Sequence, residues 1–190
     1  MLYHNTTTKS QNGFALLLAL VVVSVIVSVG LTVLDLTIKQ VRLSTNSKES
    51  EIAFHAANAA VECARYTRVL ATTTMESGSN VSMSCFGAVA ETVTPTTVIP
   101  GAYMYSPTGF TWGLSGAQRC SLMKILVIVS SSDATTTVPN MKTLMPGYPN
   151  NTKDCEPGGL CTVISAQGYS NTCGNIGTAG TVQREVLLEL

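Results

Sequence analysis

Charged side chains are scarce in this 190-residue chain, because only 12% of its residues are Asp, Glu, Lys or Arg. The 11 basic residues balance the 11 acidic ones, so the formal net charge is +0. No cluster of Lys and Arg is interleaved with aromatic residues. Without a positive field nothing in the chain attracts a polyanion. The sequence therefore predicts no nucleic-acid partner.

Groups that carry catalysis or hold metals are equally few. The chain has two histidines, and only His55 lies beyond the N-terminal region. A nucleophilic triad needs a base held in place by a partner, and a metal site needs several ligands. Glu51, four residues before His55, is the one side chain at helical spacing that could serve with it in either way, and no further ligand joins the pair. The segment Gly113–Gly116 (GLSG) lacks the last glycine of a nucleophile elbow, and no Gly-rich phosphate loop occurs. We therefore expect no enzyme activity, no metal and no cofactor.

What the chain does have is a long apolar run. Residues Phe14–Leu34 (FALLLALVVVSVIVSVGLTVL) contain no charged residue and no proline. A run of this length crosses a hydrocarbon layer of ~30 Å as a helix. Its Leu, Val and Ile residues favour insertion even though Ser24, Ser28, Gly30 and Thr32 interrupt them. The run predicts one membrane-spanning helix.

Three interpretations of this region remain open. Residues 1–13 are short and polar, which is typical of a leader. In the first interpretation an ordinary secretory signal is removed near Gly30, after the small residues Ser28-Val29-Gly30. In the second the run is a plain membrane anchor. In the third the leader is cut off between Gly13 and Phe14, and the apolar helix stays in the mature protein.

The residues after the run favour a helix that continues. Leu31–Tyr66 contains no proline and no further glycine. Its apolar residues recur at helical spacing, which gathers them on one face: Ile38, Val41, Ile52, Ala56, Ala59 and Cys63. We predict one helix over Phe14–Tyr66, with a membrane half (residues 14–34) and an amphipathic half (residues 35–66). Such continuity speaks against cleavage at Gly30.

Six cysteines all follow the apolar run: Cys63, Cys85, Cys120, Cys155, Cys161 and Cys173. Their even number, wide scatter and lack of C-x-x-C pairs predict disulfides in an oxidising compartment, although six cysteines allow fifteen pairings. The turn Glu156–Gly159 between Cys155 and Cys161 would allow those two to pair. Positive charges flanking the run do not decide its orientation, so the cysteines place the C-terminal domain outside the cytoplasm.

Beyond Tyr66 the composition changes to Thr, Ser, Gly and Pro, and residues 67–190 read as a β-rich domain. The expected strands are Val98–Tyr105, Ser121–Val129, Leu160–Tyr169 and Val182–Leu190. Ser121–Val129 is almost continuously apolar, which predicts a central strand covered on both faces. The predicted fold class is α+β, with a long N-terminal helix packed on a small antiparallel sheet.

The Gly13-Phe14 junction, between a short polar leader and a long apolar helix, resembles the cleavage site of type IV prepilins. A second set of residues resembles the end of the pilin helix in minor pilins of the PilX-like kind: Phe54, Ala57, Glu62, Cys63, Ala64, Arg65 and Tyr66. The resemblance implies a pilin-like fold, cleavage at Gly13-Phe14 by a prepilin peptidase, and methylation of the new amine. It also implies other pilin or pseudopilin subunits and the inner-membrane assembly machinery as partners.

One position departs from the pattern of major pilins. Their processed chain usually carries a glutamate at its fifth residue, which pairs with the terminal amine of a neighbouring subunit, and here that residue is Leu18. A carboxylate in the membrane costs roughly 2.5–3.5 kcal/mol, so its absence implies that this pairing is missing. Minor pilins and pseudopilins at a filament tip also lack it. The resemblance thus implies a minor subunit, with a tip or priming role.

Small residues in the apolar run form two small-xxx-small pairs. Ala15 and Ala19 are the first pair, and Ser24 and Ser28 are the second. Such pairs let helices approach closely in lipid, so these four residues are candidate helix-packing positions. The same spacing also arises by chance.

The sequence therefore predicts a structural subunit held in the inner membrane by residues 14–34, with membrane lipid as its first surroundings. The competing hypotheses are a secreted disulfide-rich binding domain released near Gly30, a plain anchored domain and an anchored enzyme.

Overall fold

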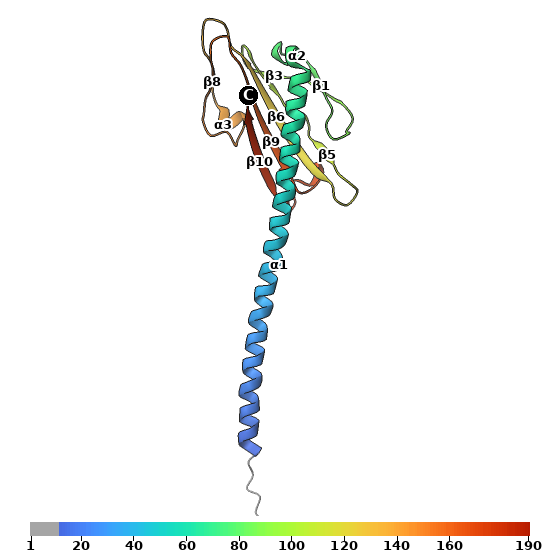
Figure 1. Cartoon of the computed structure of the whole chain (residues 1–190), viewed down its shortest axis with the longest axis vertical. Coiled ribbons are helices and arrows are strands. Elements are labelled where there is room, and N and C mark those ends of the chain that lie inside the picture. The colour runs from blue at the N-terminus through green and yellow to red at the C-terminus, as the bar shows by residue number, and fades with distance from the viewer. Residues whose placement is uncertain (1–11) are drawn as a thin grey trace, which may run out of the picture. The chain divides into compact units, whose positions relative to one another are not determined.

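The structure is a computed structural model and describes residues 12–190. These residues divide into two compact units, one that ends at Thr45 and one that comprises Asn46–Leu190, here called the globular unit. Helix α1 (Asn12–Leu70) contributes to both (Figure 1). The helix predicted over Phe14–Tyr66 is confirmed and extends four residues further. Most of the predicted leader lies outside the described residues.

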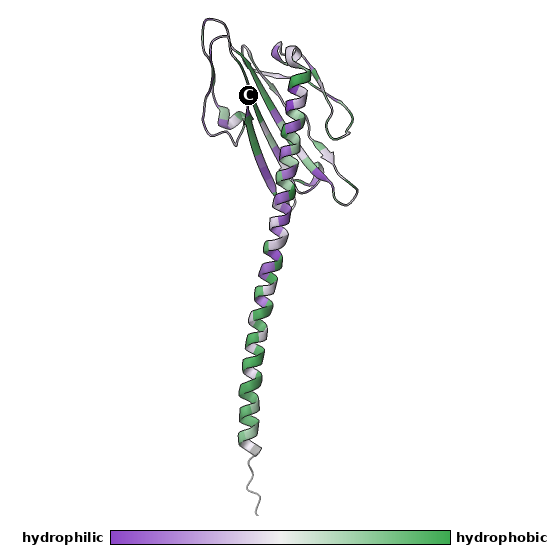
Figure 2. Cartoon of the chain, in the orientation of Figure 1, coloured by the Kyte–Doolittle hydropathy of each residue, from purple (hydrophilic) through white to green (hydrophobic). Residues whose placement is uncertain are grey.

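Hydrophobic residues dominate the first part of α1 and give way to a mixture with polar residues further on (Figure 2). The first helix residue that is buried is Ala53. Of the face predicted for packing, Ala56 is buried and Ile52, Ala59 and Cys63 are half-buried. Ile38 and Val41 are exposed. Their assignment to the packed face was wrong, because no described segment covers the helix before the globular unit begins.

The main sheet has the strand order β10-β9-β6-β4-β3, and all its pairs are antiparallel. Its strands are β3 (Thr96–Ile99), β4 (Ala102–Tyr105), β5 (Phe110–Trp112), β6 (Arg119–Val129), β9 (Leu160–Tyr169) and β10 (Gln183–Glu189). Strand β5 pairs with the beginning of β6, on the same edge of β6 that β4 occupies further along. The predicted α+β class and the central strand, now β6, are confirmed.

One strand prediction was wrong. Val98–Tyr105 is not a single strand but parts of β3 and β4, joined by a tight turn at Pro100 and Gly101. Gly101 has φ +82°, and a Cβ there would lie 2.7 Å from the carbonyl oxygen of Val129. The turn therefore requires glycine, because it combines left-handed backbone with close contact to β6.

Smaller elements complete the unit: α2 (Thr72–Glu76), β1 (Val81–Met83), β2 (Glu91–Val93), β7 (Thr136–Val138), α3 (Met141–Leu144), β8 (Lys153–Cys155) and η1 (Cys173–Asn175). Strands β1 and β2 pair with each other, as do β7 and β8.

Each face of the main sheet buries its own core. On one face the alanines of α1 pack against the odd-numbered residues of β6, including Met123, Ile125 and Val127. On the other face Leu126 and Ile128 pack against residues of the β7–α3–β8 segment. Alternate side chains of a strand point to opposite faces, so a continuous apolar run such as β6 serves both cores.

Helix α1 lies very close to the sheet because its contact residues are small. Ala53, Ala56 and Ala57 are fully buried. Opposite them is Gly168 of β9, whose absent side chain leaves room for the helix backbone. Ser121 of β6 donates a hydrogen bond to the carbonyl oxygen of Ala56 at 2.8 Å. The small residues thus fix the depth at which the helix sits on the sheet.

The C-terminal turn of α1 is fixed by Arg68, which is only 6% exposed. Its guanidinium donates hydrogen bonds to the Glu76 carboxylate at 2.8 Å and to the Thr162 hydroxyl at 3.1 Å. A buried cation is tolerated only when it is paired in this way. Arg68 therefore joins α1 to both α2 and β9.

Candidate functional site

The apolar segment of α1, Phe14–Leu34, is the feature with the clearest functional meaning. It makes α1 the one helix among the described residues that is long and apolar enough to cross a membrane, by length and composition. All its side chains are exposed; Leu16, Leu20 and Ile26, for example, are more than 60% exposed. Burying such a surface is favourable by roughly 25 cal/mol per Å², so lipid or other apolar helices around the segment would stabilise it.

The candidate helix-packing positions of this segment are not packed within the chain. Ala15 and Ala19 lie one turn apart in α1, and both are exposed. Ser24 and Ser28, the second pair, are exposed as well. Within their own unit, Ala15, Ala19, Ser24 and Ser28 therefore have no packing partner. Their contact with a helix of another subunit stays a prediction.

The hydroxyl groups in this segment are satisfied within the helix. Ser24 donates a hydrogen bond to the carbonyl oxygen of Val21 at 2.8 Å, and Ser28 donates one to that of Val25 at 2.9 Å. A polar group in hydrocarbon is costly unless it has a partner. The serines therefore fit a lipid environment without a second helix.

The two glycines proposed as processing positions have similar surroundings. Gly13 and Phe14 lie in the first turn of α1, and Gly30 lies in its interior. A Cβ at Gly13 or at Gly30 would meet nothing within 4 Å. Packing within the chain therefore requires glycine at neither position, although glycine is the poorest helix former after proline. Leu18, in the second turn, is 52% exposed.

All six cysteines are paired in disulfides. The bridges are Cys63–Cys85, Cys120–Cys173 and Cys155–Cys161. The first ties α1 to the segment after β1, the second ties β6 to η1, and the third spans the Glu156–Gly159 turn. The prediction of disulfides is confirmed, and so is the pairing that the turn allowed.

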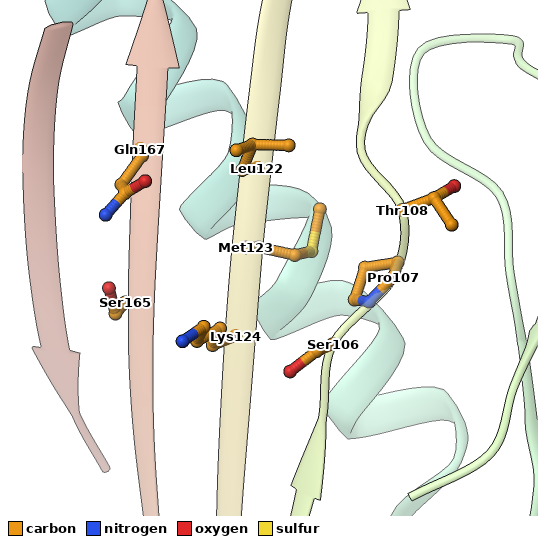
Figure 3. Close-up of a pocket in the computed structure, with 8 residues that line it drawn as sticks. All are labelled: Ser106, Pro107, Thr108, Leu122, Met123, Lys124, Ser165 and Gln167. Atoms are coloured by element: carbon orange, nitrogen blue, oxygen red, sulfur yellow. The ribbon is translucent and has the colours of Figure 1, made fainter. Parts of the chain in front are cut away.

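A hollow of about 200 Å³ lies on the sheet face opposite α1, and both polar and apolar side chains line it. Figure 3 shows it between β6, β9 and the segment after β4. The hollow lies where the sheet has a gap: β5 pairs with β6 up to Ser121, and β4 pairs with it from Ile125 onward.

The polar groups of this hollow are largely engaged with the protein itself. Lys124 donates a hydrogen bond to the carbonyl oxygen of Leu144 at 2.8 Å, and Ser165 donates one to Glu185 at 2.6 Å. Tyr169 donates its hydroxyl hydrogen to the Gln167 side chain, and burial raises the pKa of Tyr169 above its usual value. None of the lining residues forms a nucleophile–base pair.

The two sequence segments that were considered for a metal site or a nucleophile both lie on the surface. His55 and Glu51 are 3.7 Å apart, with both side chains more than two-thirds exposed. Gly113–Gly116 is the exposed loop between β5 and β6. Among residues 12–190, no group of three or more His, Cys, Asp or Glu side chains is placed to hold a metal ion.

A cluster around Glu189 holds the α3–β8 segment against β10. Lys153 and Tyr148 both donate hydrogen bonds to its carboxylate, and these bonds lower the pKa of Glu189 below its usual value. Burial, together with the hydrogen bond to Glu189, raises the pKa of Tyr148 to about 12. A carboxylate with a lowered pKa stabilises the fold above its unfolded-state pKa and loses that effect as the pH falls through the lowered value.

We therefore expect Glu189→Gln to weaken the acid sensitivity of the fold. From about pH 5 down to about pH 3, the free energy of unfolding should fall more steeply for the wild type than for Glu189→Gln. Glu156→Gln is the control, since Glu156 is exposed and its carboxylate accepts no hydrogen bond in the structure. Chemical denaturation across this pH range measures the slopes. Equal slopes for wild type and Glu189→Gln would show that the cluster does not contribute.

Sequence reasoning missed three structurally important residues, namely Gly168, Ser121 and Arg68. Only Gly168 carried a signal, because a glycine inside an apolar strand often marks a close approach of another backbone. A scan against protein-family models, a search of curated proteins and a search of solved structures found no match to the chain.

Proposed function

We propose that this protein is a structural subunit of a type IV pilus or related pseudopilus filament, of the minor class, with a tip or priming role. The observation that carries the proposal is helix α1. Its segment Phe14–Leu34 is apolar and exposed on all sides, while Asn46–Leu70 belongs to a globular unit closed by three disulfides. One helix thus joins an element that needs an apolar environment to a domain suited to an oxidising compartment.

In this proposal the apolar segment has two successive environments. It first anchors the chain in the inner membrane, with the globular unit outside the cytoplasm. A prepilin peptidase cuts between Gly13 and Phe14, and the new amine is methylated. The assembly machinery then transfers the subunit into a filament, where neighbouring apolar helices replace lipid around the segment.

Leu18 supports the minor class. A glutamate at this position would offer a neighbour's amine a partner inside the filament, and leucine offers none. A subunit that lacks this charge is best placed at the tip, where no further subunit has to be bound in that way.

The glycine in front of the apolar segment provides the test. We expect Gly13→Leu to block processing when the full chain is co-expressed with a prepilin peptidase, whereas Gly30→Leu is processed like the wild type. The two substitutions are matched, since a side chain at either glycine meets nothing within 4 Å. Immunoblotting of the membrane fraction separates the precursor from the shortened chain.

The competing hypotheses predict other patterns. A secreted domain would be released from the membrane, and Gly30→Leu would block its release while Gly13→Leu would not. A plain anchored domain would keep its full length in all three chains. Either pattern would contradict the proposed function.

A further inference from the structure

The central strand β6 contains one residue, Met123, whose backbone lacks a partner on one edge of the strand. Strand β4 pairs with β6 as far as the Tyr105–Ile125 pair. Strand β5 pairs with the same edge of β6 and begins at the Phe110–Ser121 pair. Met123 lies midway between these two pairs, so it faces the loop that joins β4 to β5.

The hydrogen-bond pattern of the sheet shows that Met123 directs its N–H and C=O groups to this edge. Further along β6, Val129 donates its N–H to the carbonyl oxygen of Gly101, at the β4 side, over 2.7 Å. Backbone groups of every second residue in a strand point to the same edge, and Met123 is six residues before Val129. Its pair partner on β9 is Ala166, which points toward β10 as Thr162 does. The ladder with β9 therefore leaves both groups of Met123 free.

The loop opposite Met123 supplies no partner for these two groups. Pro107 has no N–H, and Thr108 donates its N–H to both carboxylate oxygens of Glu91, at 3.1 and 3.2 Å. Among residues 12–190, no hydrogen bond reaches the N–H or the C=O of Met123. Met123 is only 3% exposed, and buried backbone groups are almost always paired with protein, water or a ligand. Both groups therefore call for a partner from outside the described chain.

The hollow on the sheet face opposite α1 lies at this gap (Figure 3). Met123 lines it, and the apolar side chains of Leu122 and Pro107 line it as well. Its volume of about 200 Å³ exceeds that of the one or two waters that could pair with Met123, since a water occupies about 30 Å³ in the liquid. Pockets for drug-sized ligands are larger, at roughly 300–1,000 Å³. The hollow therefore suits a small molecule or a single side chain.

The hydrogen-bonding groups of the hollow indicate what kind of group fits. Met123 offers one donor and one acceptor, both on the same edge of the strand. The amide oxygen of Gln167 accepts a hydrogen bond from Tyr169, which leaves the NH₂ group of Gln167 as a spare donor. Lys124 uses one of its three ammonium hydrogens for the carbonyl oxygen of Leu144. The hollow thus combines spare donors with one buried acceptor.

We propose that this hollow binds a primary carboxamide, the group found in Asn and Gln side chains and in small free amides. The carboxamide oxygen accepts from the N–H of Met123, and the carboxamide NH₂ donates to its C=O, so both buried groups are paired. An ionised carboxylate has no hydrogen to donate. It would also meet two acids beside the hollow, since Glu91 and Glu185 bond to the lining residues Thr108 and Ser165. The proposal is independent of the proposed function.

Titration of the full chain in detergent micelles with butyramide tests the site. The chain is labelled with [¹⁵N]methionine, and the Met123 amide signal is identified by NMR as the one that Met123→Leu removes. We expect butyramide to shift this signal saturably. Butyrate should bind about tenfold more weakly or worse, because it leaves the carbonyl of Met123 unpaired. Butanol, which carries neither an amide NH₂ nor a carbonyl, is the second comparison.

A substitution that fills the hollow provides the matched control. Ser106 lines the hollow, is exposed and makes no hydrogen bond in the structure. Ser115, an exposed serine in the loop between β5 and β6, does not line it. We expect Ser106→Leu to abolish the butyramide-dependent shift of the Met123 signal, and Ser115→Leu to preserve it. Melting curves check that both variants are folded.

Three results would overturn the proposal. The first is no saturable shift of the Met123 signal, since water alone would then occupy the hollow. The second is equal affinity for butyramide and for butyrate or butanol, and the third is unchanged binding by Ser106→Leu. A short peptide that carries Gln, compared with its Glu counterpart, distinguishes the sources of the carboxamide. Tighter binding of the Gln peptide than of butyramide supports a side chain of another protein, and weaker binding supports a free amide.

Discussion

Gly168→Ala should lower the free energy of unfolding of the globular unit by about 3 kcal/mol or more, a large effect for one methyl group. A Cβ at this position would overlap the carbonyl oxygen of Ala53 and the backbone nitrogen of Ala57, and would lie 2.8 Å from the carbonyl carbon of Ala56. All three are backbone atoms of α1, which cannot swing aside as a side chain would. The helix must move away from the sheet, and the Ser121–Ala56 hydrogen bond then lengthens.

The matched control is Gly177→Ala. Neither Gly168 nor Gly177 has a positive φ, and a Cβ at Gly177 meets nothing within 4 Å. This substitution should change the free energy of unfolding by no more than about 0.5 kcal/mol. Chemical denaturation of the full chain in detergent, followed by circular dichroism, measures both values. A similar small effect for the two variants would show that α1 does not pack on β9 as described.

Removal of the Cys120–Cys173 bridge by substitution of both cysteines with serine should destabilise the globular unit by about 4 kcal/mol. The bridge closes a separation of 53 residues, the longest of the three, so its loss frees the largest loop in the unfolded chain. It also joins the start of the central strand β6 to η1, which precedes β10. Near-UV circular dichroism during denaturation reports the loss.

Removal of each of the other two disulfides should destabilise the globular unit less. Cys155–Cys161 closes a separation of six residues and Cys63–Cys85 one of 22. By the same chain-entropy argument their removal should destabilise the unit by about 2 and about 3 kcal/mol. The loss of stability should therefore be largest for Cys120–Cys173, smaller for Cys63–Cys85 and smallest for Cys155–Cys161. If removal of Cys155–Cys161 were the most damaging, loop closure would not be the source of the stabilisation.

Much of the fold could be predicted from the sequence because its signals are periodic. The long helix follows from the absence of proline and from alanine-rich spacing in its second half, and β6 follows from a continuous apolar run. The β3–β4 hairpin was missed because Pro100-Gly101 was read as the interior of one strand instead of a turn. Ile38 and Val41 were misplaced because helical periodicity identifies a face, but not how far along the helix its partner reaches.

Some features of the candidate site could likewise be predicted from local sequence patterns, and others could not. The apolar segment and the Gly13-Phe14 junction are local patterns, so the sequence reveals them directly. The hollow between β6 and β9, by contrast, depends on strand order and on where β4 and β5 pair with β6, and neither is encoded in a short stretch of residues. The roles of Ser121 and Arg68 likewise depend on partners such as Ala56 and Glu76, and for Arg68 also on Thr162, 94 positions away.

Mass spectrometry of the mature N-terminus tests the central claim most directly. The full chain is expressed in a cell that has a pilus assembly system and is purified from its membrane and surface fractions. The proposed function predicts a chain that begins at Phe14, with one methyl group on its terminal amine. A chain that begins at Leu31, or one that retains Met1, would contradict it.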